Sequence, residues 1–416
     1  LARRHNVDMP IVTGVNAVVN GLITPAEMAL ALMTRDKTSE VNANEMTVRF
    51  ESALQRRRMH GETRRVLVGG TFPMLTAEEI AWLKNAKAHG TWLAVALVDD
   101  GEHQLALIKQ GDGTLILRGA NTYTGDTTIT GGTLTLANAA TLASNVTVNE
   151  GALFRLEATD AKTFAKTISG AGSVEKTGAG TLTLTGANTY TGATTVSGGT
   201  LELTGAVSMN AASSISLAAG TTLLLNATNP AAMTLGNDIT GTGTIHKKGG
   251  YETVLSGDVD VDLVKVADGA NQATKAGTLS FTGDSVAVNK LYLAYGQVNV
   301  GNTNGAETFM TLGQLQSGDS NEANSTVGLQ VYQGATLTVT GNNNGTGGNQ
   351  PWKNASFLLS EWNAAATVKV AGTLLVQHAN ASLGDDTTAI NINGGTMAVQ
   401  GIAQVRTNTG GALSLS

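Results

Sequence analysis

A threonine- and glycine-rich segment occurs twice in this chain with almost the same letters. Residues 113–125 read GTLILRGANTYTG and residues 180–192 read GTLTLTGANTYTG, so that Asn188 follows Asn121 by 67 residues. Self-similarity at a fixed spacing is the sequence signature of architectures that stack one repeat on the next. This duplication therefore constrains the fold more strongly than any single motif in the chain.

Each copy predicts short strands separated by turns. Residues 181–185 alternate polar and apolar side chains, as a half-buried strand does. Gly186 and Asn188 then supply turn residues, because both residue types tolerate a positive φ. Residues 194–196 and 200–203 are the next predicted strands, with leucine and valine on one face and threonine on the other.

Fainter copies of the pattern continue towards the C-terminus. Residues 168–176 align with residues 239–247 at an offset of 71 residues. Shorter echoes, two of them containing Gly-Thr-Leu, lie at residues 276–281, 334–339, 371–376 and 394–399. Repeated strands over most of the chain predict one extended repeat domain.

Strands of about four or five residues that meet at irregular, glycine-rich corners favour a parallel β-helix over a sandwich of hairpins, which prefers longer strands and two-residue turns. We therefore predict a mainly β protein, with a right-handed parallel β-helix (solenoid) over residues 101–416 and a small helical and α/β remnant before it. Coils would stack about 4.8 Å apart. Threonine and asparagine would then form ladders along the rod.

The tracts from Lys109 to Leu136 and from Lys176 to Leu203 resemble the autotransporter-associated β-strand repeat of bacterial secreted passenger domains. The resemblance implies a structural passenger for secretion, surface display or adhesion, without catalysis. It also implies a secreted or cell-surface location at the outer membrane, with the export signal and anchor outside this chain. The implied partner is a surface glycan or a protein ligand, bound through loops of the β-helix.

The first sixty residues have a helical pattern. Residues 24–27 form a capping box with Pro25 at the first helical position. Residues 1–11 and 32–40 resemble the C-terminal tail of NAD-dependent glycerol-3-phosphate dehydrogenases. The dinucleotide-binding glycines and catalytic lysine of that family lie upstream of such a tail, so residues 1–60 imply no oxidation by themselves.

Residues 61–100 resemble a truncated cytidylyltransferase. Residues 65–72, 80–90 and 93–98 predict a strand, a helix and a strand, as in the opening βαβ unit of that family. The positions that match its nucleotide-binding loop are Gly70, Thr71, Phe72, Thr76 and Glu79.

This loop departs from the family pattern at the residues that would bind the nucleotide. Pro73 stands in place of an aspartate, and Thr76 and Glu79 stand in place of two histidines that contact the nucleotide phosphates. The carboxylates of Glu78 and Glu79 would repel a triphosphate, and residues 76–79 form a capping box that satisfies the helix start by itself. We therefore expect a degenerate segment that binds no nucleotide, while an active nucleotidyltransferase or dehydrogenase-derived enzyme remains the alternative.

Composition excludes several functions. The formal net charge is −6, which disfavours a nucleic acid as partner because phosphate binding needs clustered lysine and arginine. No apolar run is long enough for a transmembrane helix, and there is no cysteine for a disulfide.

The six histidines are scattered without ligand spacing, so no metal site and no cofactor is expected. The alternation in residues 258–262 predicts a strand with a charged, solvated face rather than a calcium loop.

The longest low-complexity loop, residues 341–349, is the candidate ligand site. Asn343 and Asn344 lie in it, and Trp352 and Trp362 follow it closely. Long loops on a rigid scaffold often carry binding function. An exposed tryptophan beside asparagine could stack on a sugar, whereas the alternative is an aromatic that caps a strand. A polysaccharide-binding or polysaccharide-acting β-helix is thus a second alternative function. An enzyme of this kind would need carboxylates clustered on one face of the rod, whereas the alternating pattern predicts isolated carboxylates.

Overall fold

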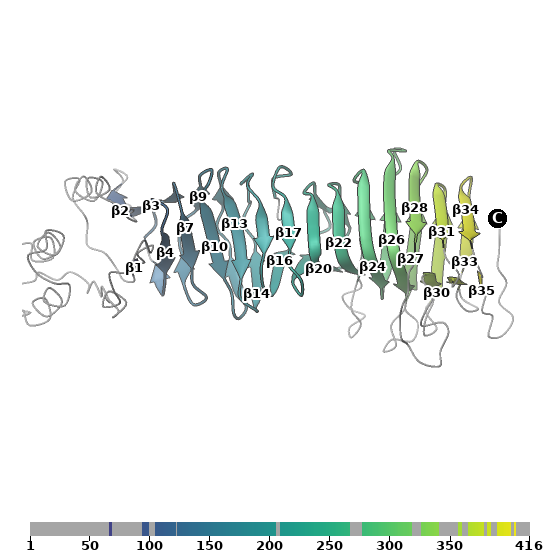
Figure 1. Cartoon of the computed structure of the whole chain (residues 1–416), viewed down its shortest axis with the longest axis horizontal. Coiled ribbons are helices and arrows are strands. Elements are labelled where there is room, and N and C mark those ends of the chain that lie inside the picture. Colours follow the sequence, from purple (N-terminus) through teal and green to yellow (C-terminus); the bar gives the residue numbers. More distant parts are fainter. Residues whose placement is uncertain are drawn as a thin grey trace, which may run out of the picture.

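The computed structural model describes residues 66–68, 94–99, 105–121, 123–204, 209–266, 277–317, 326–340, 357–359, 365–377, 381–383, 389–400 and 403–404. These residues form strands and turns, and no α-helix occurs among them. The strands stack side by side along one axis, so the described chain is a parallel β-solenoid (Figure 1). The predicted fold class is confirmed. The described part of the chain also contains no helix long and apolar enough to cross a membrane.

The strands lie on three faces, which we number in the order in which the chain visits them, and most coils contribute to all three. Face 1 contains β3 Leu105–Gln110, β6 Thr127–Ile129, β9 Val146–Val148, β12 Ile168–Ser169, β19 Met233–Leu235, β21 Thr253–Leu255, β23 Thr278–Phe281, β25 Gly296–Val300, β27 Thr326–Val331, β30 Ala365–Val370 and β33 Ala389–Ile392. Its strands pair in parallel as two sheets, one up to β12 and one from β19 onward.

Faces 2 and 3 belong to one continuous sheet. Face 2 contains β4 Thr114–Leu117, β7 Thr133–Leu136, β10 Leu153–Glu157, β13 Ser173–Thr177, β15 Thr194–Val196, β17 Ile215–Leu217, β28 Ala335–Val339, β31 Thr373–Gln377 and β34 Thr396–Gln400. Face 3 contains β11 Lys162–Phe164, β14 Thr181–Leu184, β16 Thr200–Thr204, β18 Thr222–Asn226, β29 Phe357–Leu359, β32 Ala381–Leu383 and β35 Ala403–Gln404.

Long strands join faces 2 and 3 in the middle of the rod. They are β20 Ile239–Lys248, β22 Val259–Val266, β24 Ser285–Leu293 and β26 Thr308–Ser317. The first half of β20 pairs with β17 on face 2, and its second half pairs with β18 on face 3. The register between β20 and β22 shifts between Gly241 and Thr244, where the strand turns the corner. A continuous, bent strand therefore replaces the loop between faces 2 and 3 in these coils.

The strands predicted within the second repeat copy are confirmed. β14, β15 and β16 start at residues 181, 194 and 200, the positions expected from the alternation. Along β14 the threonines are partly exposed, whereas the leucines are buried. The four shorter echoes likewise correspond to β23, β28, β31 and β34.

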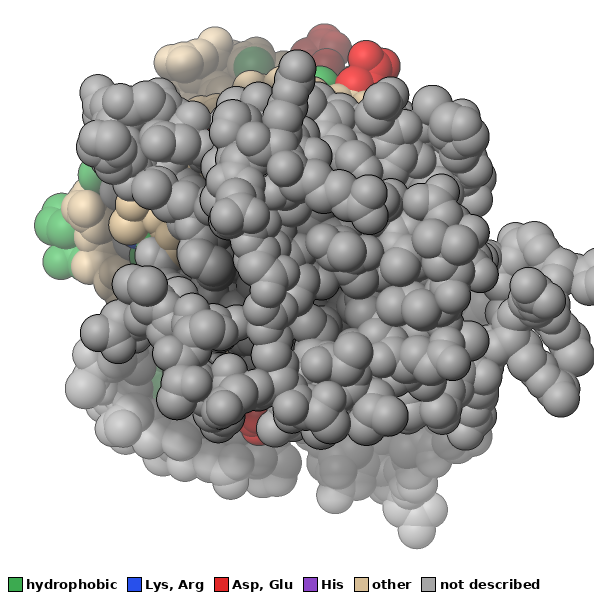
Figure 2. Space-filling model, turned by 90° about the vertical axis from the view of Figure 1, so that its left-hand side faces the viewer, with side chains coloured by type: hydrophobic (Ala, Val, Ile, Leu, Met, Phe, Trp, Pro, Cys, Tyr) green, Lys and Arg blue, Asp and Glu red, His purple; other side chains and the backbone are tan. Residues whose placement is uncertain are grey.

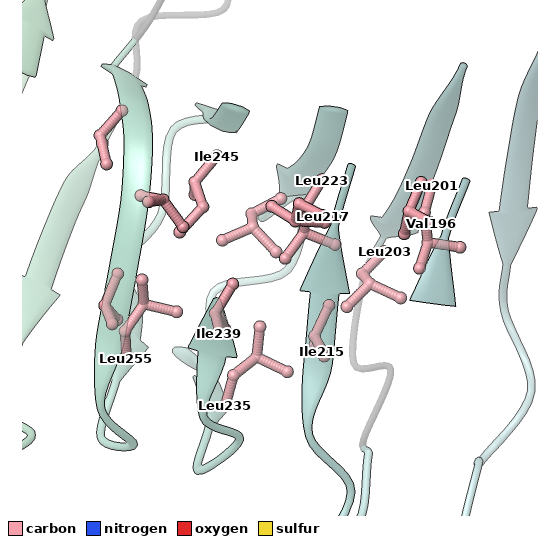
Figure 3. Close-up of a cluster of buried hydrophobic side chains, with 14 of the residues drawn as sticks. Val196, Leu201, Leu203, Ile215, Leu217, Leu223, Leu235, Ile239, Ile245 and Leu255 are labelled. Carbon is pink, nitrogen blue, oxygen red and sulfur yellow. The ribbon is translucent and has the colours of Figure 1, made fainter. Parts of the chain in front are cut away.

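Apolar side chains of successive coils stack into ladders that fill the interior. On face 3, Leu201 pairs with Leu223, and Leu223 pairs with Ile245. All three are at most 1 % exposed, and Figure 3 shows them following one another along the rod. Because a coil buries its apolar face only against its neighbours, this core is continuous along the axis. Phe154 and Phe164 add an edge-to-face ring contact, with centroids 5.7 Å apart.

The remaining strands lie at the N-terminal end of the described chain. β1 Val66–Val68 pairs in parallel with β4, and β2 Ala94–Asp99 pairs antiparallel with β3. β5 Ala120–Asn121 and β8 Thr141–Leu142 form a two-stranded sheet of their own. The boundaries proposed for residues 1–60 and 61–100 stay predictions, because the structure describes only β1 and β2 of those segments. Figure 2 looks along the rod from this end, and the described side chains visible at its rim include carboxylates.

Candidate functional site

The residues that the sequence singled out as candidate ligand contacts all lie outside the described residues. They are Gly70, Thr71, Phe72, Thr76, Glu79, Asn343, Asn344, Trp352 and Trp362. The structure does describe the strands on either side of the candidate loop: β28 precedes it on face 2, and β29 follows it on face 3. Their roles in binding therefore stay predictions, and the described chemistry of this protein lies in the corners of its coils.

Three buried lysines occupy corners of the solenoid. Lys109, Lys176 and Lys247 are each at most 1 % exposed, although each carries an ammonium group. The Nζ atom of each donates a hydrogen bond to the carbonyl oxygen of the glycine two residues later. These glycines are Gly111, Gly178 and Gly249, with φ angles of 75°, 82° and 79°. The left-handed glycine turns its carbonyl towards the lysine, so Lys-x-Gly is one structural unit.

Lys176 has the most complete set of contacts. Its Nζ lies 2.7 Å from the oxygen of Gly180 and 2.8 Å from the oxygen of Gly198, in addition to its contact with Gly178. Gly198 belongs to the next coil, and Lys109 reaches Gly131 of its next coil in the same way. Lys109 and Lys176 thus each link two coils, and all three lysines supply donors to carbonyl oxygens at their corners.

Burial changes the acidity of these lysines. Desolvation lowers the pKa of Lys109, Lys176 and Lys247 to about 8, from the ordinary value of 10.5. For Lys109 the nearby charge of Asp112 acts in the opposite direction. Lys162 has the same pKa of about 8 for the same reason, opposed by Glu157, and its Nζ lies 2.6 Å from the carbonyl oxygen of Ala137. A lysine that donates to carbonyl oxygens is therefore a recurrent device of these corners.

The three Lys-x-Gly units lie on three different faces. Lys109 is on β3 of face 1, Lys176 on β13 of face 2, and Lys247 on the second half of β20, which pairs on face 3. From β3 the stack passes through β6, β9 and β12, and the next strand of the chain is β13. The sequence repeat therefore spans three coils and one further face, so each copy is rotated by one corner relative to the preceding copy.

A chain of buried hydroxyl groups forms a second element of the repeat. The phenol oxygen of Tyr190 lies 2.7 Å from Oγ1 of Thr194, which lies 3.3 Å from Oγ of Ser213 in the next coil. Ser213 Oγ donates to the carbonyl oxygen of Gly192 at 2.7 Å. Burial raises the pKa of Tyr190 to about 12, which the hydrogen bond with Thr194 partly offsets. This network joins two coils through side-chain hydroxyl groups and one carbonyl oxygen.

The first copy of the repeat forms the same hydroxyl chain. Tyr123, Thr127 and Ser144 are linked by distances of 3.0 Å and 2.7 Å. Burial also raises the pKa of Tyr123 to about 12, opposed by its contacts with Thr127 and Ser144. The Asn-Thr-Tyr-Thr letters shared by the two copies therefore encode one recurring corner.

The repeated asparagines bond to main-chain atoms. The positive φ on which the predicted turn rests is absent at Gly186, and Asn121 lies in strand β5. Asn188 is 1 % exposed, and its Nδ2 donates to the carbonyl oxygen of Gly186 at 2.9 Å. Its Oδ1 accepts from the backbone N–H of Ile168 in the preceding coil at 3.3 Å. In the first copy, Nδ2 of Asn121 donates to Thr141 of the next coil at 3.0 Å. Each side chain substitutes for main-chain partners where the strand pairing is interrupted.

Polar ladders run along the outside of the rod. Nε of Arg155 lies 2.7 Å from Oε2 of Glu175, whose Oε1 accepts from Ser197 Oγ at 2.8 Å. The predicted charged, solvated strand face is also confirmed: on β22 the valines at 259 and 261 are buried, whereas Asp260 and Asp262 are exposed. Asp262 accepts from Asn289 of the next coil at 2.8 Å. These side chains bond to neighbours along the stack.

The lysines, tyrosines and asparagines of the corners bond to main-chain atoms or hydroxyl groups of their own coil or of an adjacent coil. Among the residues that the structure describes, no group of three or more histidine, cysteine, aspartate or glutamate side chains could hold a metal ion. What these corners do chemically is satisfy buried polar atoms and fix the position of one coil on the next.

The role of the buried lysines is not evident from composition, because lysine is seldom fully buried. A signal is nevertheless present: lysine stands two residues before a glycine at corresponding positions of all three aligned copies. The spacing shows that the position recurs, but the direction of its side chain depends on the neighbouring coil.

Comparison with known proteins supports the architecture. The family described as passenger-associated-transport-repeat matches residues 107–136 and 174–203. Each matched segment starts two residues before one of the corner lysines and includes its Lys-x-Gly unit. No curated protein and no solved structure matches the chain significantly. The two matches and the β-solenoid together support an autotransporter passenger-like repeat protein. The resemblances of the first hundred residues to a dehydrogenase and a cytidylyltransferase are not supported by these comparisons.

Proposed function

We propose that this chain is a structural passenger segment: a stiff rod that is secreted or displayed at the cell surface and has no catalytic role of its own. The observation that carries the proposal is the stack of parallel strands, closed at its corners by the repeated lysine and tyrosine units. Function in such a rod comes from length, rigidity and the surfaces that it presents, because each coil contacts only its neighbours.

Two further observations favour this function over the alternatives. The matched repeat segments belong to a family described by passenger transport, which fits export. The buried hydrogen-bond chains are local to each corner and need no disulfide, and the chain has no cysteine. The enzyme alternatives depend on residues outside the described part of the chain, so no described contact favours them.

Surface display tests the proposal directly. The full chain would be joined to a secretion signal and an outer-membrane anchor, with an epitope tag at its N-terminus. We expect antibody to label intact cells, and a mild protease on those cells to leave a resistant fragment that contains residues 123–204. The matched control is Leu201→Asp, which places a carboxylate in the buried ladder and should abolish the resistant fragment. Equal protease sensitivity of the two chains, or a tag that remains inside the cell, would contradict the proposal.

A further inference from the structure

Two rows of uncharged side chains run along the outside of face 2 in the C-terminal half of the rod. They lie on the first halves of β24 and β26 and on β28, β31 and β34, which pair in parallel one after another (Figure 1). The first row contains Ser285, Phe309, Thr336, Thr373 and Thr396. The second row contains Ala287, Thr311, Thr338, Leu375 and Ala398. All of these side chains are exposed or partly exposed, and we call the two rows the face-2 platform.

The threonine hydroxyl groups of the platform are available to a ligand. No residue that the structure describes forms a hydrogen bond with the side chains of Thr311, Thr336, Thr338, Thr373 and Thr396. Outward hydroxyl groups elsewhere on the rod are paired, as Thr183 is with Glu202. Because a hydroxyl group both donates and accepts, a row of unpaired hydroxyls suits a ligand that is itself rich in hydroxyl groups.

Phe309 adds an apolar contact in the middle of these hydroxyl groups. It is the most exposed large apolar side chain among the described residues, at 54 %. The fold does not need a ring at this position, because Ser285 and Thr336 occupy it in the two neighbouring coils. An aromatic ring on a flat sheet offers a surface against which the C–H face of a sugar ring packs.

The charges around the platform favour a neutral ligand. Asp260 of β22 pairs in register with Ala287, and Asp284 and Glu307 precede the first row at β24 and β26. All three carboxylates are exposed, so they repel an anionic polymer, whereas they accept hydrogen bonds from neutral hydroxyl groups. The only lysine or arginine of the five strands, Lys290, lies past the corner on face 3.

We propose that the face-2 platform binds a neutral β1→4-linked glucan chain that lies extended along the rod. Neighbouring strands lie about 4.8 Å apart, which is close to the length that each sugar adds to such a chain, so one sugar lies over each coil. The two rows are about 6.6 Å apart and lie under the flat face of the chain. A regular polymer matches rows that recur at every coil, whereas a globular protein surface has no such repeat.

Adsorption of the purified full chain to amorphous cellulose tests the inference. Insoluble starch is the comparison, because its α1→4 linkages coil the chain. We expect saturable binding to cellulose and much weaker binding to starch. The affinity for cellulose should be the same at low and physiological salt, because no charge pair contributes to it.

Removal of the exposed ring is the first variant. Phe309→Ala should bind cellulose at least about fivefold more weakly, because one sugar loses its aromatic contact. The matched control is Tyr251→Ala, which removes the other exposed large aromatic side chain, 41 % exposed in the turn between β20 and β21. This control should bind within about twofold of the wild type.

A second pair of variants obstructs the row of hydroxyl groups. Thr338→Lys places a long side chain across the platform, and binding should weaken by about threefold or more because that side chain must be ordered or displaced. Thr222→Lys makes the same change at a partly exposed threonine of face 3 and should have no effect on binding. Circular dichroism and protease resistance would establish that all four variants are folded.

Three results would overturn the inference: no saturable binding of the wild-type chain to cellulose, equal binding to cellulose and starch, or equal weakening by Phe309→Ala and Tyr251→Ala. Dimerisation of the wild-type chain that Phe309→Ala abolishes would also overturn it, and would assign the platform to a second copy of the chain. The inference goes beyond the displayed-rod function and fails separately from it. A chain that keeps its protease-resistant fragment without binding cellulose contradicts the platform alone, whereas loss of that fragment contradicts the rod.

Discussion

At the scale of single residues, the corners of this solenoid depend on long polar side chains that reach main-chain oxygens. Lys176 is the clearest case, because its ammonium group donates to carbonyl oxygens of two coils while the side chain is buried. Methionine has a similar length but no donor. We expect Lys176→Met to lower the free energy of unfolding by about 1–3 kcal/mol, because carbonyl oxygens lose their partner. Urea denaturation at pH 7 measures this, with Lys166→Met as the control at a partly exposed site.

The same lysine predicts how stability depends on pH. Its pKa falls from 10.5 to about 8 on folding, so between these values the unfolded chain binds more protons than the folded chain. The free energy of unfolding therefore rises with pH between about 8 and 10.5, because the buried lysine loses its charge over this range. Urea midpoints of the wild type and Lys176→Met, compared from pH 7 to pH 10, should diverge as pH rises. Parallel curves would contradict the assignment.

The two tyrosine corners supply a matched pair of substitutions. Tyr190 is 1 % exposed, whereas Tyr123 is partly exposed. Replacing either tyrosine with phenylalanine removes the phenol oxygen, so the hydroxyl group of Thr194 or Thr127 loses one hydrogen-bond partner. We expect Tyr190→Phe to reduce the free energy of unfolding by about 1 kcal/mol and Tyr123→Phe by less, because water can replace the lost bond at the more exposed corner. Thermal or urea unfolding of the two variants would show the order, and the reverse order would count against this account.

At the scale of elements, glycine conformation determines how one strand follows another. Gly199, between β15 and β16, has a φ of 61°, and a Cβ there would lie 2.3 Å from the carbonyl oxygen of Gly180 in the preceding coil. Gly220, between β17 and β18, has a φ of 74° but open space around a Cβ. We expect Gly220→Ala to cost about 1–2 kcal/mol for the left-handed backbone alone. Gly199→Ala should cost clearly more, because coil spacing must also change.

Comparison of these two alanine variants by urea denaturation separates backbone strain from contact between coils. Hydrogen exchange would locate the effect of Gly199→Ala in β14 and β16, which pair directly. Equal destabilisation by the two substitutions would mean that the close approach at Gly199 relaxes without consequence.

At the scale of the whole molecule, coils are interchangeable units as long as the register is kept. Leu153 pairs with Ser173, so excision of residues 153–172 removes one coil and brings Ser173 to the place of Leu153. We expect the shortened chain to fold as a parallel β-rod, because each coil contacts only its neighbours. Excision of residues 153–162 alone should disrupt folding, since every later strand would then stack on the wrong face. Circular dichroism and protease resistance compare them, and equal behaviour of the two deletions would contradict a register-dependent stack.

Much of the local structure could be predicted from the sequence. The starts of β14, β15 and β16 follow from alternating leucine and threonine, and Asp258 to Asp262 correctly predicts a solvated strand face. By contrast, the long strands β20, β22, β24 and β26 were not predictable, because the glycine, aspartate or asparagine near the middle of each permits either a turn or a continued, bent strand. The candidate loop residues Asn343 and Trp352 remain predictions from the sequence alone.

The sequence by itself determined that this protein is a stack of short strands, because strand periodicity and turn residues are local properties that repeat along the chain. Only the tertiary structure decided where each repeated residue lies. The spacing from Lys109 to Lys176 amounts to three coils and one face, so identical letters occupy different corners of the rod. The number of residues in a coil depends on the length of each corner, and that length is fixed by packing against the adjacent coil.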